Sequence, residues 1–207
     1  HTDCMSYMRG LPDKAFDLCI VDPPYGMKAL GAQDGGSSSK KHLAYHNGSI
    51  SDWDTAPGVE YFNELKRVSC DQIIWGGNYF PLPPTRCVIV WDKVQVMAGY
   101  FSQVEIAWTS FTHPTRLFTF RNTYDGKIHP TQKPVALYRW LLKNYAKPGQ
   151  RILDTHLGSG SIAIACDIEG FDLVGCEIDA DYFAGARKRL ADHQAQPRLF
   201  APEVKPP

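Results

Sequence analysis

The residues best suited to chemistry are Asp22, Pro23, Pro24 and Tyr25, which directly follow the apolar run Phe16–Val21. That run predicts a buried strand, so the four residues would stand at its carboxyl end. Two successive prolines remove two amide donors, which leaves the Asp22 carboxylate and the Pro23 carbonyl as acceptors. Tyr25 adds a ring face for stacking. Together they predict a site that holds a planar ring carrying an amino group; a strand ending in a proline-rich turn is the alternative.

A second group of residues, 154–161, runs from a strand pattern through a glycine turn into a helix pattern. Gly158 and Gly160 let the backbone approach a ligand, and the start of the helix offers free amides. The next strand pattern ends at Glu177, an acid placed to accept both ribose hydroxyls of a nucleoside. The chain has no GxxxxGK[ST] segment, and the acidic surroundings suit a ligand without phosphates. These residues predict a nucleoside-containing cofactor.

The elements that must position these residues alternate between strand and helix patterns. Apolar runs predict strands at 16–21, 72–75, 87–91, 104–108, 151–154 and 172–176. Helix patterns occupy 60–68, 135–147, 161–169 and 181–194. This alternation predicts an α/β fold with one open, mostly parallel sheet and helices on both faces. A length of 207 residues fits a single domain, 1–207.

Composition and cysteine usage disfavour several classes of protein. No run of about 18 or more apolar residues is present, and no basic-then-apolar leader, so we expect a cytoplasmic protein without a membrane partner. The six cysteines form no CxxC pair, which predicts buried thiols and no structural metal. Because the sequence starts at His1 and not at a methionine, we expect that the chain has been trimmed at its amino end.

Charge is balanced overall, with 22 basic and 22 acidic residues, but it is uneven along the chain. Residues 111–151 contain eight basic residues and one acid, whereas residues 152–193 contain three basic residues and eight acids. Such a basic stretch is expected if one face meets nucleic-acid phosphates. A solvated helix face explains it equally well, so charge alone does not decide the partner.

The order of these motifs resembles that of the amino-group DNA methyltransferases dependent on S-adenosylmethionine, in the permuted arrangement with the catalytic half before the cofactor half. The matching segments are Asp3-Cys4, 11–13 (LPD), 22–26 (DPPYG), 75–80 (WGGNYF), 91–93 (WDK), 129–134 (HPTQKP), 154–161 and 175–179 (GCEID). In their order along the chain, these segments are spread over nearly its whole length. The resemblance implies a Rossmann-like methyltransferase sheet of seven mostly parallel strands with helices on both faces.

The resemblance also implies roles for individual residues. The catalytic motif would be Asp22, Pro23, Pro24 and Tyr25. The cofactor S-adenosylmethionine would be held by Asp3, Cys4, Asp22, His129, Thr131, Lys133, Asp154, His156, Leu157, Gly158, Gly160, Ser161, Glu177 and Ile178. Most family members carry Pro-Phe where this chain has Thr155-His156. We expect the His156 imidazole to replace an apolar ring against the cofactor, as a packing residue rather than a base.

The first residue of the catalytic motif predicts the substrate. In the family, aspartate there usually accompanies methylation of adenine N6 and serine that of cytosine N4, so we predict adenine, flipped out of double-stranded DNA. Cytosine N4 methylation, methylation of RNA or protein, and a non-catalytic DNA-binding relative are the alternatives. Stretches 27–58 and 109–128 are candidate loop insertions for contacts with DNA bases, or ordinary exposed loops. A homodimer is expected from the resemblance alone.

Overall fold

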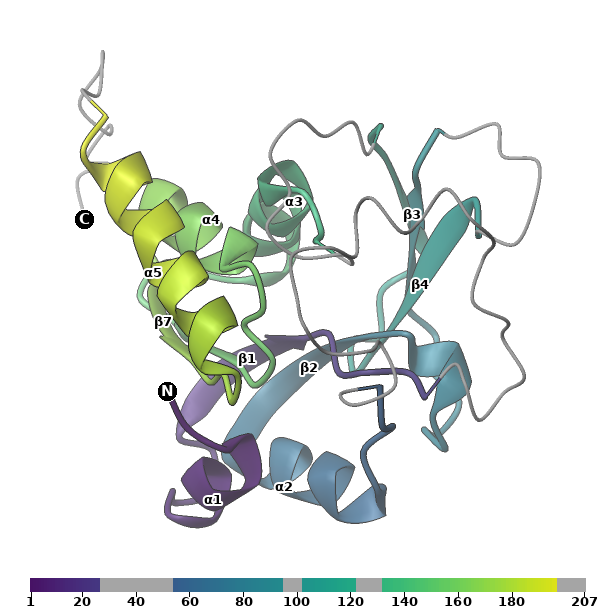
Figure 1. The fold of residues 1–207 in the computed structure, drawn as a ribbon. Coiled ribbons are helices and arrows are strands. Elements are labelled where there is room, and N and C mark those ends of the chain that lie inside the picture. The colour runs from purple at the N-terminus through teal and green to yellow at the C-terminus, as the bar shows by residue number, and fades with distance from the viewer. Residues whose placement is uncertain (27–53, 95–101, 122–131, 197–207) are drawn as a thin grey trace, which may run out of the picture.

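The computed structural model of the chain describes residues 1–26, 54–94, 102–121 and 132–196. The strands are β1 (Phe16–Val21), β2 (Ser69–Trp75), β3 (Val88–Asp92), β4 (Val104–Thr109), β5 (Arg116–Thr119), β6 (Arg151–Asp154) and β7 (Asp172–Gly175). They form one seven-stranded sheet in the order β5-β3-β4-β2-β1-β6-β7 (Figure 1). Neighbouring strands pair in parallel, except that β4 runs antiparallel to β2 and β3. The predicted Rossmann-like, mostly parallel sheet is confirmed; the permuted order of its halves stays a prediction.

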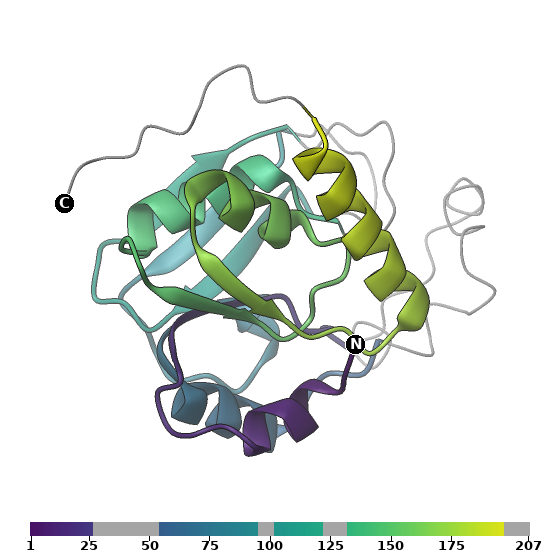
Figure 2. The same ribbon diagram turned by 90° about the vertical axis from the view of Figure 1, so that its left-hand side faces the viewer.

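Helices cover both faces of the sheet, as predicted (Figures 1 and 2). One face carries α1 (Cys4–Arg9) and α2 (Val59–Val68), and the other carries α3 (Val135–Tyr145) and α4 (Ser161–Glu169), with α5 (Ala180–Gln194) beside α4. A 3-10 turn, η3 (Gly77–Tyr79), follows β2. The sheet is therefore the middle of three layers.

The central strand β1 shows why both faces need cover. Leu18 and Ile20 belong to the core beneath α3 and α4, whereas Cys19 and Val21 belong to the core beneath α1 and α2. None of these four side chains is more than 1% exposed. A continuous apolar run is typical of a strand buried on both sides. Because side chains alternate along a strand, Asp22 follows Val21 on the side of α3 and α4.

Some elements differ from the sequence prediction. Strand β5 and the end of β4 lie within 109–128, which was predicted as a loop; β5 is mostly exposed and therefore lacks a buried apolar run. Helix α1 was missed because its six residues are too few to show a helical period. Strand β2 begins at Ser69 rather than Gln72, because α2 runs directly into it. Residues 27–53 and 122–128 of the two predicted insertions lie outside the described residues.

None of the helices in the described ranges is long and apolar enough to cross a membrane. All six thiols are free; those of Cys19, Cys87, Cys166 and Cys176 are buried, as predicted, whereas Cys4 is half-buried and Cys70 is exposed, contrary to the prediction. Among the residues that the structure describes, no three His, Cys, Asp or Glu side chains are grouped closely enough to hold a metal ion.

Candidate active site

Acidic side chains gather at one edge of the sheet, where the neighbouring strands β1, β6 and β7 end. Asp22 follows β1, Asp154 ends β6, and Glu177 lies just beyond β7. Parallel neighbours present their carboxyl ends at a common edge, the usual ligand site of such sheets. Burial, together with the nearby negative charges of Asp22 and Glu177, raises the pKa of Asp154 to about 8, and the hydrogen bond from the His156 amide opposes the shift.

The Asp22 carboxylate has a partner on each oxygen. Oδ1 accepts a hydrogen bond from the Tyr25 hydroxyl at 2.7 Å, and Oδ2 accepts one from Lys133 Nζ at 2.5 Å. Burial raises the pKa of the Asp22 carboxyl, and the Lys133 ammonium opposes that shift. Pro23, next in the chain, is buried. Of the predicted catalytic residues, the structure thus places Tyr25 in contact with the Asp22 carboxylate, and Pro23 and Pro24 lie between the two in the chain.

The Tyr25 ring, predicted to stack on a base, already packs on other aromatic rings. Its centroid lies 5.1 Å from that of Tyr79 in a stacked arrangement, and 6.1 Å from that of Phe80 in an edge arrangement. Tyr79 is 39% exposed. Tyr79 therefore extends the aromatic surface toward solvent, a role that the sequence analysis did not assign, although the motif 75–80 contains it.

Lys133, whose contact with the cofactor stays a prediction, is paired with two carboxylates. Only 2% of its side chain is exposed, and its ammonium lies 2.5 Å from Asp22 Oδ2 and 3.0 Å from Glu105 Oε2. Glu105 also pairs with Lys93 at 2.7 Å. Sequence analysis missed Glu105, for which the available signal was a single charged residue within the otherwise apolar strand pattern 104–108.

Hydrogen bonds to Glu177 connect the glycine turn to the segment that follows β7. The backbone amide of Gly158 donates to Glu177 Oε2 at 2.8 Å, and the amide of Asp179 donates to Oε1 at 2.9 Å. Gly160 has φ +70°, and a Cβ there would lie 2.9 Å from Ala186 Cβ on α5. Leu157 N donates to Cys176 O at 2.9 Å. The predicted turn residues therefore lie together, with Ser161 beginning α4.

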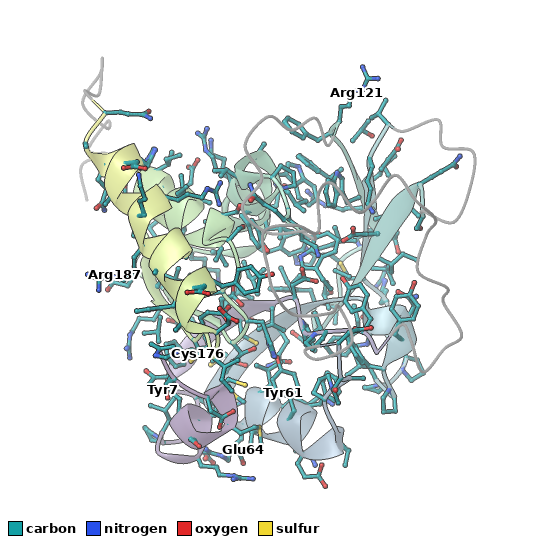
Figure 3. The ribbon with its side chains drawn as sticks, in the orientation of Figure 1. Tyr7, Tyr61, Glu64, Arg121, Cys176 and Arg187 are labelled. Carbon is teal, nitrogen blue, oxygen red and sulfur yellow. The ribbon has the colours of Figure 1, made fainter. Side chains whose placement is uncertain are left out.

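Thr155 and His156, where the chain departs from the family pattern, form a polar chain with α2. The Tyr61 hydroxyl, which projects from α2 toward the sheet (Figure 3), lies 2.6 Å from Thr155 Oγ1. Thr155 Oγ1 lies 3.0 Å from His156 Nδ1. Burial lowers the pKa of His156 to about 4, so its imidazole is neutral at pH 7. Packing of His156 against the cofactor stays a prediction.

The amino end of the chain reaches the same edge. Thr2 N donates to Glu177 O at 2.9 Å, and His1 Nε2 lies 2.9 Å from Ile178 O. The Asp3 carboxylate accepts from Ser6 N at 2.7 Å, which lowers the pKa of Asp3. Cys4 is half-buried and the side chain of Ile178 is 71% exposed. His129 and Thr131, also predicted as cofactor ligands, lie outside the described residues.

Comparison with known proteins identifies the family of this chain. Residues 74–188, more than half of the chain, match the N6/N4 methyltransferase family, described as DNA methylase. The chain belongs to this family of DNA methylases.

Individual relatives of the methylase are distant. The type II methyltransferase M.HpaI of Haemophilus parainfluenzae is 21% identical over 229 residues, which cover 91% of this chain and 72% of the relative. The crystal structure of the M1.HpyAVI–SAM complex has a TM-score of 0.56 at 19% identity, covering 92% of this chain and 98% of that one. The PvuII DNA methyltransferase (cytosine-N4-specific) has a TM-score of 0.61 at 12% identity, covering 97% and 86%. At these identities the two structures establish the fold alone.

The basic stretch 111–151 of the methylase is partly neutralised by its surroundings. Arg139 Nε and Lys143 Nζ lie 2.6 Å and 3.4 Å from Glu169 Oε1. Arg116 donates to Asn144 Oδ1 at 2.7 Å, whereas Arg121 points away from the sheet (Figure 3). Contact between this stretch and DNA stays a prediction.

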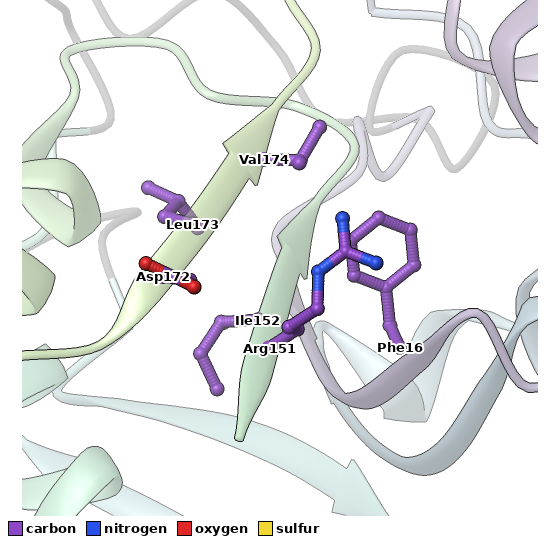
Figure 4. A pocket seen from close by; sticks show the side chains of 6 residues that line it. All are labelled: Phe16, Arg151, Ile152, Asp172, Leu173 and Val174. Carbon is purple, nitrogen blue, oxygen red and sulfur yellow. The ribbon is translucent and has the colours of Figure 1, made fainter. Parts of the chain in front are cut away.

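A hollow of about 240 Å³ lies at the opposite edge of the sheet, where β1, β6 and β7 begin (Figure 4). Its lining consists of Phe16, Arg151, Ile152, Asp172, Leu173 and Val174. The Arg151 guanidinium lies over the Phe16 ring, 5.0 Å from its centroid. Because it lies at the starts of the strands, this hollow is separate from the acidic edge of the methylase.

Gly76→Ala should disturb the catalytic motif of the methylase through Tyr25. Gly76 has φ +67°, and a Cβ there would lie 2.2 Å from Tyr25 Cε1. The ring would have to move, and with it the hydroxyl that bonds Asp22. We expect the free energy of unfolding to fall by about 2–5 kcal/mol, from left-handed strain and overpacking together. Urea unfolding and a methyl-transfer assay measure the two effects.

Gly149→Ala is the matched control for this variant. Gly149 has φ +82°, but nothing lies within 4 Å of a Cβ built there. This substitution therefore carries the left-handed strain, about 1–2 kcal/mol, without the collision. Equal losses of stability in the two variants would contradict the role assigned to the contact between Gly76 and Tyr25.

His156→Phe should reduce the loss of stability of the methylase in acid. The folded pKa of about 4 lies below the unfolded value of about 6.5, so the unfolded chain binds a proton first as pH falls. Proton uptake by His156 in the unfolded chain therefore lowers the free energy of unfolding between pH 6.5 and 4, by about 2 kcal/mol at pH 5. Urea unfolding of wild type and variant at pH 7 and pH 5 measures the difference. The same pH dependence in both proteins would show that His156 is not held neutral.

Proposed function

We propose that this DNA methylase transfers the methyl group of S-adenosylmethionine to the N6 amine of an adenine flipped out of double-stranded DNA. The observation that carries the proposal is the Asp22 carboxylate at the carboxyl end of β1, on the same edge as Asp154 and Glu177. Aspartate at the first position of the catalytic motif favours adenine over cytosine, since family members with that residue usually methylate adenine.

The acceptors around Asp22 suit an exocyclic amine. The lone pair of such an amine is delocalised into its ring, so it attacks poorly until its hydrogens are drawn out of the ring plane. Asp22 and the Pro23 carbonyl would each accept one N–H. Although Tyr25 and Lys133 each occupy one site on Asp22, a carboxylate oxygen can accept two hydrogen bonds. Such positioning can contribute about 7–11 kcal/mol, and Asp22 or water takes the released proton.

The glycine turn fits the cofactor in charge and in hydrogen bonding. S-adenosylmethionine, when bound, supplies a methyl group on a positively charged sulfonium. Each oxygen of Glu177 holds one backbone amide and retains a lone pair for a ribose hydroxyl. Burial holds the pKa of Asp154 near 8, so a cationic ligand beside it would favour its charged form. One solved structure of the same fold is a SAM complex.

The aromatic pair of Tyr25 and Tyr79 would hold the flipped base. Flipping costs a few kcal/mol, and stacking on an aromatic side chain returns about 1–3 kcal/mol per base. The exposure of Tyr79 and its stacking on Tyr25 support a shared platform beside Asp22. Double-stranded DNA is therefore the proposed partner, and the homodimer stays a prediction of the resemblance.

The deciding experiment incubates the protein with methyl-labelled S-adenosylmethionine and unmethylated DNA, followed by digestion to nucleosides and mass spectrometry. Labelled N6-methyladenine is the expected product. N4-methylcytosine would keep the mechanism and overturn the choice of base. Absence of label, with cofactor binding intact by calorimetry, would overturn DNA methylation and favour an RNA or protein substrate, or a non-catalytic DNA-binding protein.

A further inference from the structure

Four charged side chains form a continuous row that ends on the proposed catalytic carboxylate. Lys93 pairs with Glu105 at 2.7 Å, Glu105 pairs with Lys133 at 3.0 Å, and Lys133 pairs with Asp22 at 2.5 Å. The four side chains are between 2% and 22% exposed. They come from four places in the fold: the residue after β1, the residue after β3, the strand β4 and the segment before α3. Two acids and two bases make the row neutral.

We propose that Lys133, held in place by Glu105, is a positioning residue that fixes the Asp22 carboxylate as a charged acceptor for the target amine. The proposal rests on the proposed function and adds to it a residue that acts through Asp22. It assigns Lys133 to the catalytic motif rather than to the cofactor.

The surroundings of the Lys133 ammonium leave it few other arrangements. Its Nζ lies within reach of Asp22, of Glu105 and, at 3.4 Å, of the Tyr25 hydroxyl. The ammonium also lies 5.3 Å from the centroid of the Trp75 ring, within the range of a cation–π contact. An ammonium has three hydrogens, and three polar groups surround this one. Lys133 is therefore oriented by the protein before any substrate arrives.

Glu105 reaches this position because β4 runs opposite to its neighbours. Glu105 is the second residue of β4 and lies opposite Trp91, near the carboxyl end of β3. On the same strand, Ala107 lies opposite Trp75, the last residue of β2. The start of the reversed strand thus meets the ends of the parallel strands. A parallel strand would present its carboxyl end there instead.

The physical need for Lys133 follows from the burial of Asp22. A buried carboxyl tends to take up a proton unless an opposite charge is close, and a protonated carboxyl loses acceptor capacity on one oxygen. Four groups face Asp22. Lys133 and the Tyr25 hydroxyl lower the pKa of Asp22, whereas Glu105 raises it. The fourth group is Asp154, whose pKa is raised by the charge of Asp22. Without Lys133, burial and the negative charge of Glu105 would raise the pKa of Asp22, because the main group that lowers it would be gone.

The test compares pH profiles of methyl transfer for wild type, Lys133→Met, Lys133→Arg and Glu105→Gln. Lys133→Met should move the acid limb of kcat/KM upward by about 1–3 pH units, since a neighbouring opposite charge shifts a carboxyl by that much. Lys133→Arg keeps the charge and should restore much of the wild-type profile. Glu105→Gln removes a negative charge from near Asp22, so its acid limb should move downward. Lys188→Met is the control, because Lys188 is an exposed lysine on α5.

Opposite shifts for Lys133→Met and Glu105→Gln would support the proposal, because loss of a merely structural contact would lower activity without moving the profile. An unshifted profile in Lys133→Met, with cofactor affinity and melting temperature retained, would overturn it. A fall in cofactor affinity without a shift would also overturn it and return Lys133 to the cofactor site. Failure of wild type to methylate DNA would instead contradict the proposed function, so the two failures are distinguishable.

Discussion

Asp22→Ala is expected to abolish methyl transfer while leaving the affinity for S-adenosylmethionine largely unchanged. The substitution removes the carboxylate that would accept the target amine, and loss of one preorganised polar group of this kind costs about 10²–10³-fold in rate. The glycine turn should persist, because the Glu177 carboxylate is held by the amides of Gly158 and Asp179 and not by Asp22. Labelled methyl transfer to DNA and calorimetry with the cofactor measure the two quantities.

Asp13→Ala is the matched control for this prediction. Asp13 is a largely exposed acid that pairs with Arg67, on the face of α1 and α2. Its removal should leave methyl transfer close to wild type. Residual activity above a few per cent in Asp22→Ala would contradict the role given to its carboxylate, and a parallel loss of cofactor binding would point to general damage.

Glu177→Ala is expected to weaken cofactor binding by about 10²–10⁴-fold, because two hydrogen bonds to a charged group contribute about 1.5–3 kcal/mol each. The variant would lose its proposed bonds to the ribose and also release the amide of Gly158 in the turn. Calorimetry with S-adenosylmethionine measures the affinity. Glu177→Gln keeps one acceptor oxygen, so its affinity for the cofactor should lie between those of Glu177→Ala and wild type.

The control for Glu177 is Asp192→Ala, which removes an exposed acid that pairs with Lys188 on α5. Its cofactor affinity should match that of wild type. Wild-type affinity in Glu177→Ala, with a normal melting temperature, would show that the acid at the end of β7 serves the turn rather than the ligand.

Sequence patterns predicted the central part of the fold because burial there is complete. Strand β1 is apolar at nearly every position, since helices cover both of its faces, and this made both the strand and the placement of Asp22 predictable. The glycine turn was equally visible, because Gly158 and Gly160 have positive φ, where other residues are strained. At the edge of the sheet, β5 has four mostly exposed residues and gave no such signal.

Within the candidate active site, residue types were predictable but pairings were not. The motif 22–25 identified the carboxylate, yet nothing in it indicated that Lys133 and Glu105 would surround that group. Ion pairs between distant segments depend on strand order and direction, and a reversed β4 cannot be read from its own residues. Likewise, Tyr79 became a candidate for stacking only when η3 set it on Tyr25.

The position of β1 between β2 and β6 also bears on how the chain folds. Asp17 of β1 accepts a hydrogen bond from the amide of Arg151, 134 residues away, and Lys133 bonds Asp22 across 111 residues. Closing such long loops costs entropy before the contacts return any stability, and non-local pairing slows folding. The glycine turn and Glu177 lie close together in sequence, whereas the Asp22 cluster needs chain segments from both halves. We therefore expect the Asp22 cluster to form later in folding than the glycine turn, so that a partly folded chain would hold the turn but lack the cluster.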